Sequence, residues 1–435
     1  MNERTIVGLV FTPKLEPRNS KLLRAGDVMK ITWSHAVLPA VLLWSVLFAQ
    51  PARGGEPSLE TLVEGNSGFA LDVYRRLSVA EGNLFFSPHS ISTALAMTFA
   101  GARGDTEKQM AQVLHFHLDR KDLHEAFAEL ESTLATAQQG GGVTLDVANG
   151  LWPQKEYPLR EDYLSLVKKH YGVSVTPVDY RSAAEDARRM INRWVEQKTR
   201  DKIRDLIQPG VLDPMTRLVL VNAIYFKGMW ENRFKVEDTR DTPFHIAEGK
   251  AVQAPMMNLR KEFGYADLDS LQILEMPYAG KSLSMLVLLP RKVDGMRQLE
   301  ADLAPAKLKE WMSVLRRKEV VVFLPRFKMT SMFRLDETLA ALGMRDAFSP
   351  ARADFSGMDG RKGWLHIGVV LHKAFVEVNE EGTEAAAATA VGIRATAMPA
   401  PPPEFRADRP FLFLIMEKET GSILFMGRVT DPTRT

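Results

Sequence analysis

The spacing of apolar residues predicts several helices, most of them in the N-terminal half of the chain. Apolar side chains recur every three to four residues in the segment 61–77, as on the buried face of a helix. The segment 91–100 is nearly all apolar and follows Ser87-Pro88, a pair typical of a helix start, so a buried helix is expected there. Three further segments have helical spacing: 122–134, 183–198 and 299–315.

Strand patterns dominate the C-terminal half. Several short segments are rich in β-branched and aromatic residues and are apolar on both faces, which is typical of strands at the centre of a covered sheet. These segments are 218–226, 283–289, 320–324, 411–416 and 423–429. Because helices and strands do not alternate regularly, the pattern predicts an α+β fold rather than a doubly wound sheet.

One segment interrupts this pattern. Residues 380–403 lie between the strand-like segments 371–379 and 411–416 and read EEGTEAAAATAVGIRATAMPAPPP. A connection of this length is too long for an ordinary loop, and such loops are usually functional or disordered. Its first half consists almost entirely of small residues, and its proline-rich end is expected to be extended.

Composition sets the size and chemistry of the protein. The chain has 435 residues, 45% of them hydrophobic, and no linker-like stretch divides its middle, so one large domain over residues 58–434 is predicted. The 56 basic and 54 acidic residues leave a net charge of +2, which gives no argument for nucleic acid or an anionic membrane as a partner. There is no cysteine, so thiol catalysis, thiolate metal sites and disulfides are excluded.

The N-terminal part resembles a secretory signal. Lys30 precedes the apolar run 36–49, and small and polar residues follow it. Residues 29–52 are therefore predicted to be a signal peptide with cleavage near Ala49, and residues 1–28 a dispensable or non-native extension. An uncleaved anchor is the alternative, although the run is shorter than the roughly 20 residues of a membrane span. The prediction is a secreted protein, periplasmic or released.

No enzyme motif is present. The sequence lacks G-x-S-x-G, H-E-x-x-H and the phosphate-binding loop motif. The glycines at 140–142 are expected in a plain loop, and His115 and His117 have no acidic or cysteine partner at metal-ligand spacing. Ser87 is expected to cap a helix. No catalytic residue, metal or cofactor is expected, and a secreted hydrolase is the disfavoured alternative.

Dense motifs between about Leu59 and Val429 resemble the serpin family of protease inhibitors. Gly368 departs from the family pattern, since many members have serine at this position. The matching motifs are 83–88 (NLFFSP), 90–92 (SIS), 101–106 (GARGDT), 222–230 (NAIYFKGMW), 255–257 (PMM), 324–327 (LPRF), 342–344 (LGM), 353–358 (ADFSGM), 372–374 (HKA), 377–387 (EVNEEGTEAAA), 408–411 (DRPF) and 425–428 (FMGR).

The resemblance implies a fold and a set of functional residues. The expected fold has three β-sheets, about nine helices and an exposed reactive-centre loop at residues 380–404. The family's shutter, the polar latch that allows the main sheet to open, maps onto Ser87, Ser90, Asn222 and His372. Its breach, the place where insertion starts, maps onto Trp230. The hinge maps onto Glu380, Glu381, Gly382, Thr383, Glu384, Ala385, Ala386, Ala387 and Ala388. The family register places the cleaved bond between Thr396 and Ala397, with cleavage after Arg394 as the alternative.

The resemblance also implies a suicide mechanism. A serine protease cleaves the loop and forms a covalent acyl-enzyme, and the loop then enters the main sheet as a new strand. In the family register the inward-facing residues of this strand are Thr383, Ala385, Ala387, Thr389 and Val391, all uncharged. A charge there would be buried without a partner, so this composition favours an inhibitor over a non-inhibitory binding or carrier protein.

The residues around the bond predict the class of target. Ala395, Thr396 and Ala397 suit a protease with a small primary pocket, such as an elastase-like or subtilisin-like enzyme. A trypsin-like enzyme is expected to cleave after Arg394, and the protein should behave toward it mainly as a substrate. The expected partner is thus a target protease held in a covalent complex by a monomeric inhibitor.

Overall fold

Four strands form the sheet that carries the predicted sites. They are β2 (Val143–Pro153), β3 (Leu218–Gly228), β9 (Phe327–Arg334) and β10 (Val370–Val378), in the order β2–β3–β10–β9. The pairs β2–β3 and β9–β10 are antiparallel, whereas β3 and β10 run parallel to each other. The two central strands are therefore the parallel pair, although their neighbours on both sides are antiparallel to them.

A second sheet contains the remaining strands in the order β1–β13–β12–β7–β6–β5–β8–β11, with β4 paired to β5. The long strand β5 pairs with β4 and β8 and, near its end, also with β6. Two of the three expected sheets are therefore joined into one hydrogen-bonded surface. Its strands are β1 (Leu84–Phe86), β4 (Arg240–Ala247), β5 (Lys250–Asp267), β6 (Leu271–Pro277), β7 (Leu283–Pro290), β8 (Arg316–Pro325), β11 (Glu404–Arg406), β12 (Phe411–Glu417) and β13 (Ile423–Val429).

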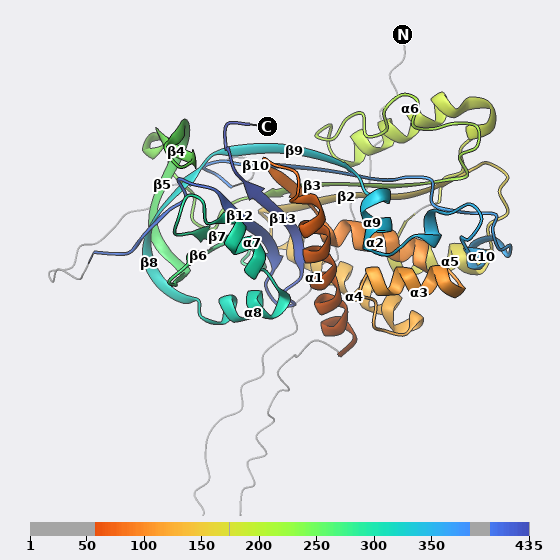
Figure 1. The fold of residues 1–435 in the computed structure, drawn as a ribbon, viewed down its shortest axis with the longest axis horizontal. Coiled ribbons are helices and arrows are strands. Elements are labelled where there is room, and N and C mark those ends of the chain that lie inside the picture. The colour runs from red at the N-terminus through yellow and green to blue at the C-terminus, as the bar shows by residue number, and fades with distance from the viewer. Residues whose placement is uncertain (1–56, 174, 383–400, 435) are drawn as a thin grey trace, which may run out of the picture. The chain divides into compact units, whose positions relative to one another are not determined.

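The helices cover both faces of the four-stranded sheet. In Figure 1, α6 lies on one side of it and α2 to α5 lie on the other. The helices are α1 (Pro57–Leu77), α2 (Pro88–Phe99), α3 (Gly104–Val113), α4 (Arg120–Gln139), α5 (Glu161–Tyr171), α6 (Tyr180–Lys198), α7 (Met296–Asp302), α8 (Pro305–Ser313), α9 (Asp336–Leu342) and α10 (Ser356–Asp359). Short 3₁₀ turns occupy Val236–Asp238 and Asp346–Phe348.

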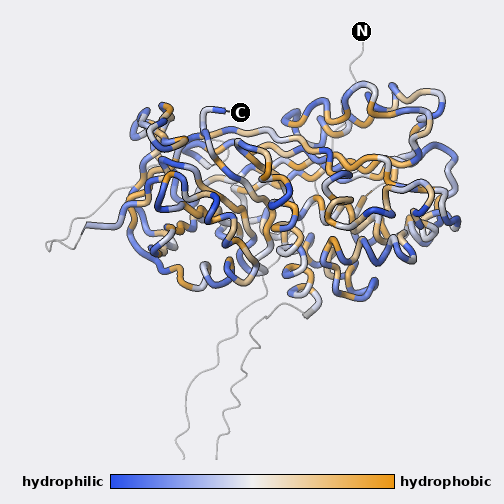
Figure 2. The backbone as a smooth tube through the Cα atoms, in the orientation of Figure 1, coloured by the Kyte–Doolittle hydropathy of each residue, from blue (hydrophilic) through white to orange (hydrophobic). Residues whose placement is uncertain are grey.

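The burial of the central strands explains their apolar sequence. Val219 and Val221 of β3 pack in the core beneath α6, while Leu220 and Ile224 face the larger core on the other side. Figure 2 shows apolar residues running along the strands and the inner faces of the helices. Because both faces are covered, β3 reads as a continuous apolar run, as a strand buried on both sides should.

The computed structural model describes residues 57–173, 175–382 and 401–434. These described residues form one compact unit. The α+β class and each expected helix and strand segment are confirmed, except that the segment 299–315 is two helices, because Leu303 is extended and Pro305 starts a new helix. Within the described residues, no helix combines the length and apolarity needed to cross a membrane.

Candidate functional site

The contact between β3 and β10 is the centre of the candidate site. Six residue pairs join the two strands, from Leu220 with Val370 to Tyr225 with Phe375. The strands are direct neighbours, so no other strand lies between them. We call this contact the seam. Because the seam joins two parallel strands, an additional strand placed between them in the opposite direction would make the whole sheet antiparallel.

A tight turn follows the end of β10 and includes the described part of the predicted hinge. The amide of Asn379 donates to the carbonyl of Gly382 at 2.8 Å, and the amide of Gly382 donates back at 3.2 Å. Gly382 has a φ of +127°, and an added Cβ would lie 2.2 Å from the Gly228 carbonyl oxygen. Only glycine fits this backbone, which explains the residue type at the hinge.

Trp230, the predicted breach residue, holds this turn against the end of β3. Its amide donates to the carbonyl of Glu381 at 2.9 Å, and its indole Nε1 donates to the carbonyl of Asn379 at 3.0 Å. The indole is buried and stacks on Tyr278, with ring centroids 4.7 Å apart. Both polar contacts hold the backbone of the turn, so Trp230 fixes the point where the chain leaves the sheet.

Glu380 is a buried carboxylate with two separate partners. The hydroxyl of Thr239 donates to Oε1 at 2.7 Å, and Arg326 Nε lies 3.6 Å from Oε2. The amide of Phe234 donates to the Glu380 carbonyl at 2.8 Å. Buried charges require partners, and Thr239 and Arg326 were not foreseen because they lie on distant segments of the chain.

The four predicted shutter residues lie in one hydrogen-bonded network on the α2 side of the seam. The amide of Ser87 donates to His372 Nε2 at 3.0 Å, and its hydroxyl donates to the Leu424 carbonyl at 2.6 Å. Asn222 donates to the Ser90 carbonyl at 2.8 Å, and its side-chain oxygen pairs with His372 Nδ1. The Ser87 hydroxyl also accepts from the Ser90 amide at 3.1 Å, so it caps α2 as expected.

Asn149 of β2 completes the network and was missed by the sequence analysis. Its side-chain oxygen accepts from Asn222 Nδ2 and from the Ser90 hydroxyl. Asn149 is opposite Asn222 in the β2–β3 register. The only signal in the sequence was an asparagine in a strand of otherwise mostly apolar residues, and the partner strand was needed to interpret it.

The network fixes the protonation state of His372. Its Nε2 accepts a hydrogen bond from the Ser87 amide, so Nδ1 carries the ring proton and donates to Asn222. Complete burial lowers the pKa of His372 from 6.5 to about 3. The imidazole is therefore neutral at physiological pH, and a second ring proton would displace the hydrogen bond from Ser87.

The other predicted residues of the loop lie outside the described residues. These are Thr383, Glu384, Ala385, Ala386, Ala387, Ala388, Arg394, Thr396 and Ala397. The described chain resumes at Pro401, and β11 follows immediately, paired in parallel with β8.

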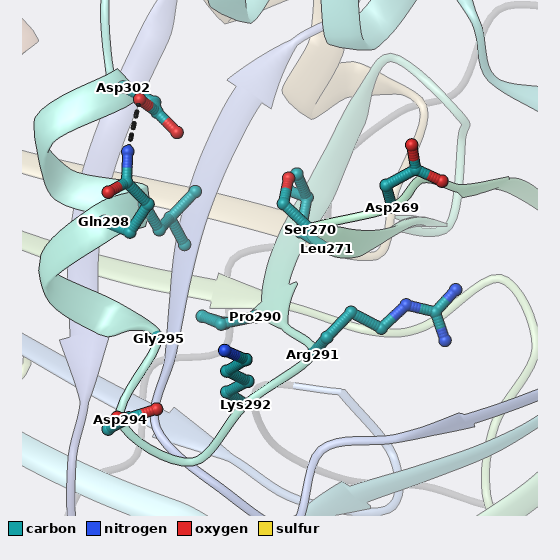
Figure 3. Close-up of a pocket in the computed structure, with 11 residues that line it drawn as sticks. Asp269, Ser270, Leu271, Pro290, Arg291, Lys292, Asp294, Gly295, Gln298 and Asp302 are labelled. Atoms are coloured by element: carbon teal, nitrogen blue, oxygen red, sulfur yellow. Dashed lines mark hydrogen bonds between the residues drawn. The ribbon is translucent and has the colours of Figure 1, made fainter.

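A separate pocket of about 490 Å³ lies between α7 and the open end of the β6–β7 hairpin (Figure 3). Asp269, Asp294 and Asp302 line it together with Arg291 and Lys292. None of the predicted site residues that the structure describes lines it. Elsewhere, the Nε2 atom of His115 pairs with the carboxylate of Asp72 at 2.8 Å.

Comparison with known proteins agrees with this geometry. The model of the family "Serpin (serine protease inhibitor)" matches residues 64–432. Leukocyte elastase inhibitor A of Rattus norvegicus is 44% identical over 384 residues, covering 86% of this chain and all of the relative. Leukocyte elastase inhibitor of Homo sapiens is 42% identical with the same coverage.

Solved structures match over a similar extent. Uncleaved ovalbumin is 34% identical with a TM-score of 0.77, covering 86% of this chain and all of that one. Human thyroxine-binding globulin in complex with thyroxine is 33% identical, also with a TM-score of 0.77, and covers 87% of this chain and all of its own. The similarity therefore extends over the whole four-stranded sheet and the site built on it.

Proposed function

The chain belongs to the serpin family of serine protease inhibitors, and from this premise we propose that it traps its target by inserting its own cleaved loop into the seam. The observation that carries the proposal is the parallel pair β3–β10, followed directly by the hinge turn. A chain leaving Gly382 next to Met229 is already antiparallel to β3. Continued in that direction, it would occupy the seam with every backbone group paired to a neighbouring strand.

The length of the loop suits this insertion. The 14 residues from Thr383 to Thr396 span about 46 Å when extended, and the 11 residues of β3 span about 36 Å. The arm is therefore long enough to run the full length of β3. Its inward-facing residues are uncharged, which suits a strand covered on both faces.

The covalent step follows the chemistry of serine proteases. The serine oxygen of the protease attacks the carbonyl carbon of Thr396, and the bond to the nitrogen of Ala397 breaks. The serine proton passes through the protease's own base to the leaving amine of Ala397. The protease is left as an ester of Thr396, and insertion of the arm carries it to the far end of β3 before water hydrolyses the ester.

The polar network gives the seam a way to open. The buried amide, hydroxyl and imidazole groups of the shutter can exchange partners, whereas an apolar contact of the same area offers no defined second arrangement. We assign Ser87, Ser90, Asn149, Asn222 and His372 to this role. The stored free energy of the uncleaved form is then released when the new strand fills the seam.

Two observations support an elastase-like target. The proposed bond is flanked by small residues, Ala395 and Ala397, and the relatives at 42–44% identity are named leukocyte elastase inhibitors. The fold alone does not separate inhibition from carriage, because thyroxine-binding globulin shares it with a TM-score of 0.77. A binding or carrier protein is therefore the second candidate.

Incubation with an elastase-like protease tests the proposal. We expect an adduct that survives denaturing electrophoresis and whose mass places the cut after Thr396, while a trypsin-like enzyme mainly cleaves after Arg394. The matched control is Thr383→Arg, which places a charge on the inward face and should be cleaved without trapping. Cleavage of the unmodified chain without an adduct, and without a higher thermal midpoint, would favour the carrier.

We also propose that the protein is secreted with residues 29–52 removed. The charged start, the short apolar run 36–49 and the small residues after it support this. Mass analysis of the protein from the periplasm and the culture medium should find a chain that starts near residue 50. Recovery of the chain only from the cytosol, with residues 29–52 intact, would contradict secretion.

A further inference from the structure

A second cavity, of about 220 Å³, lies at the outer edge of the four-stranded sheet, beside the edge strand β2. Its walls come from elements on both faces of the sheet: α2, α4 and the end of α5 on one face, and the last turn of α6 on the other (Figure 1). Six of its lining residues bring polar groups or rings to the cavity: Thr93, Glu131, Asn149, Tyr171, Trp194 and Lys198.

Thr93 of α2 contributes a buried hydroxyl to this cavity. The residue is 3% exposed, and its Oγ1 has no hydrogen-bond partner within the described part of the chain. Burying a hydroxyl without a partner costs free energy, and buried polar groups in native proteins are nearly always paired with protein, water or a ligand. Because Thr93 lines the cavity, a molecule bound there can supply the missing partner.

Asn149 and Lys198 bring two more donor groups to the cavity. The side-chain oxygen of Asn149 accepts from Asn222 and from the Ser90 hydroxyl, whereas no described residue accepts from its Nδ2. Lys198 is exposed, and none of the described carboxylates lies within ion-pair distance of its ammonium. The unmatched groups, with the Thr93 hydroxyl, can therefore all donate hydrogen bonds, and one of them is positively charged.

The acidic and phenolic groups of the cavity already have partners. Glu131 Oε1 lies 3.2 Å from Nε2 of the buried His89. The hydroxyl of Tyr171 pairs with His124 Nδ1 at 2.6 Å. Glu131 is the one acidic residue among the described residues that line the cavity, so the charge that remains to be matched is that of Lys198. The complementary ligand is an anion that accepts hydrogen bonds.

Aromatic rings form much of the apolar lining. Trp194 packs over β2 next to Asn149, because Gly150 leaves room for the indole: an added Cβ on Gly150 would lie 3.1 Å from Trp194 Cη2. Tyr171 and Val147 add apolar surface. An apolar cavity of about 150 Å³ can hold benzene. The larger cavity here therefore admits one aromatic ring with a short acidic substituent.

We propose that this cavity binds a small aromatic carboxylate of the size of phenylacetate. Its ring packs against Trp194 and Tyr171, where aromatic rings find favourable offset or edge-to-face contacts. Its carboxylate accepts hydrogen bonds from Asn149 Nδ2 and the Thr93 hydroxyl and pairs with the Lys198 ammonium. Each of the three unmatched groups of the cavity then has a partner.

The ligand also acts on the opening of the seam, an effect that rests on the proposed function. The start of α2 is tied to β10, because the Ser87 amide donates to His372. In contrast, β2 is paired along its whole length with β3. A strand inserted between β3 and β10 therefore moves β2 relative to α2, and the cavity has walls on both of these elements. A ligand that fits the cavity of the uncleaved form favours that form over the inserted one.

Titration of the uncleaved protein with phenylacetate, followed by ligand-observed NMR, tests the site. We expect saturable binding, about tenfold weaker in Lys198→Met, which removes the charge, and about threefold weaker in Thr93→Val, which keeps the shape and removes the hydroxyl. The matched control is Lys168→Met on α5. Lys168 is also exposed but lies outside the cavity, so this variant should bind phenylacetate as the unmodified chain does.

The charge of the probe is varied in the same titration. Phenylacetamide has nearly the same shape without the charge and should bind about tenfold more weakly than phenylacetate. Tighter binding of benzylamine than of phenylacetate would show that Glu131 sets the charge of the ligand, and would overturn the assignment. The absence of saturable binding to the unmodified chain, or equal binding to all of the variants, would overturn the site itself.

Thermal unfolding measures the effect on the seam. Saturating phenylacetate should raise the midpoint of the uncleaved protein more than that of the loop-cleaved protein. It should also increase the number of inhibitor molecules cleaved for each elastase-like protease that is trapped. Equal shifts in the two forms would overturn the effect on the seam but not the site. If the unmodified chain traps no protease, the proposed function fails, whereas the NMR titration still decides the site.

Discussion

The seam between β3 and β10 and the contact between β12 and β13 are both buried strand pairs, but they are held together differently. At the seam, Asn222 and His372 are paired across the two strands within a polar network. Between β12 and β13 no facing pair is polar on both strands, and Arg428, opposite Leu412, is the one charged residue in the register. Phe85 of β1 stacks on Phe413 and Phe425 with centroid distances of 5.8 and 5.3 Å. Burial by itself therefore does not distinguish the two contacts.

The difference suggests how one molecule combines a permanent core with a contact that opens. Interlocked aromatic rings lose packing as soon as they separate, and no new partner replaces it. Polar groups that are separated can form hydrogen bonds with an inserted backbone or with each other in a new arrangement. The seam is thus suited to opening, and the β12–β13 contact to remaining closed in both forms.

The largest effect is expected in the permanent core. Phe413→Ala removes a ring that contacts Phe85 and Phe327, and should lower the free energy of unfolding by about 3–5 kcal/mol. The loss should be the same in the intact and the loop-cleaved protein, because insertion leaves this contact unchanged. Guanidinium unfolding of both forms measures it, and a loss confined to the intact form would contradict the comparison.

The second largest effect is expected on acidification, which should weaken the seam. In the unfolded chain His372 has its ordinary pKa near 6.5, whereas burial lowers its pKa in the folded state to about 3. The contribution of neutral His372 to the free energy of unfolding is fully present above pH 6.5 and is lost as the pH falls toward 3. The loss is about 1.4 kcal/mol per pH unit, or about 3 kcal/mol at pH 4.5. Urea unfolding should show a shallower pH dependence in His372→Gln.

His124 on α4 provides the control for this measurement. Burial, followed by the charges of His170 and Arg120, lowers its pKa to about 4, so it contributes a similar pH dependence away from the seam. In His124→Gln, the part of the pH dependence of the unfolding free energy that comes from His372 should remain. An identical slope in the unmodified protein and in His372→Gln would show that His372 takes no part.

A smaller effect is expected from Asn222→Ala. The substitution leaves His372 Nδ1 and the Ser90 carbonyl without their partner, and should cost the intact form about 1–3 kcal/mol of unfolding free energy. The proposed insertion separates β3 from β10 in the loop-cleaved form, so the loss should be smaller there. Equal losses in the two forms would mean that the network does not respond to insertion.

Much of this site was predictable from the sequence. The apolar runs predicted β3, β12 and β13, and the motif around Asn222 carried the resemblance that grouped it with Ser87, Ser90 and His372. The glycine at 382 was assigned to the hinge by the same resemblance. Asn149, Thr239, Tyr278 and Arg326 were not predicted, because each acts through a partner between 48 and 141 positions away in the chain.

By itself, the sequence determined the class of fold, the strands and helices, and the residue types at the hinge, because periodicity and the backbone freedom of glycine are local properties. The tertiary structure alone decided that β3 and β10 are direct parallel neighbours and that the buried carboxylate of Glu380 lies beside the Thr239 hydroxyl and the Arg326 guanidinium. These relations depend on strand register and on burial, which arise only when distant segments pack together.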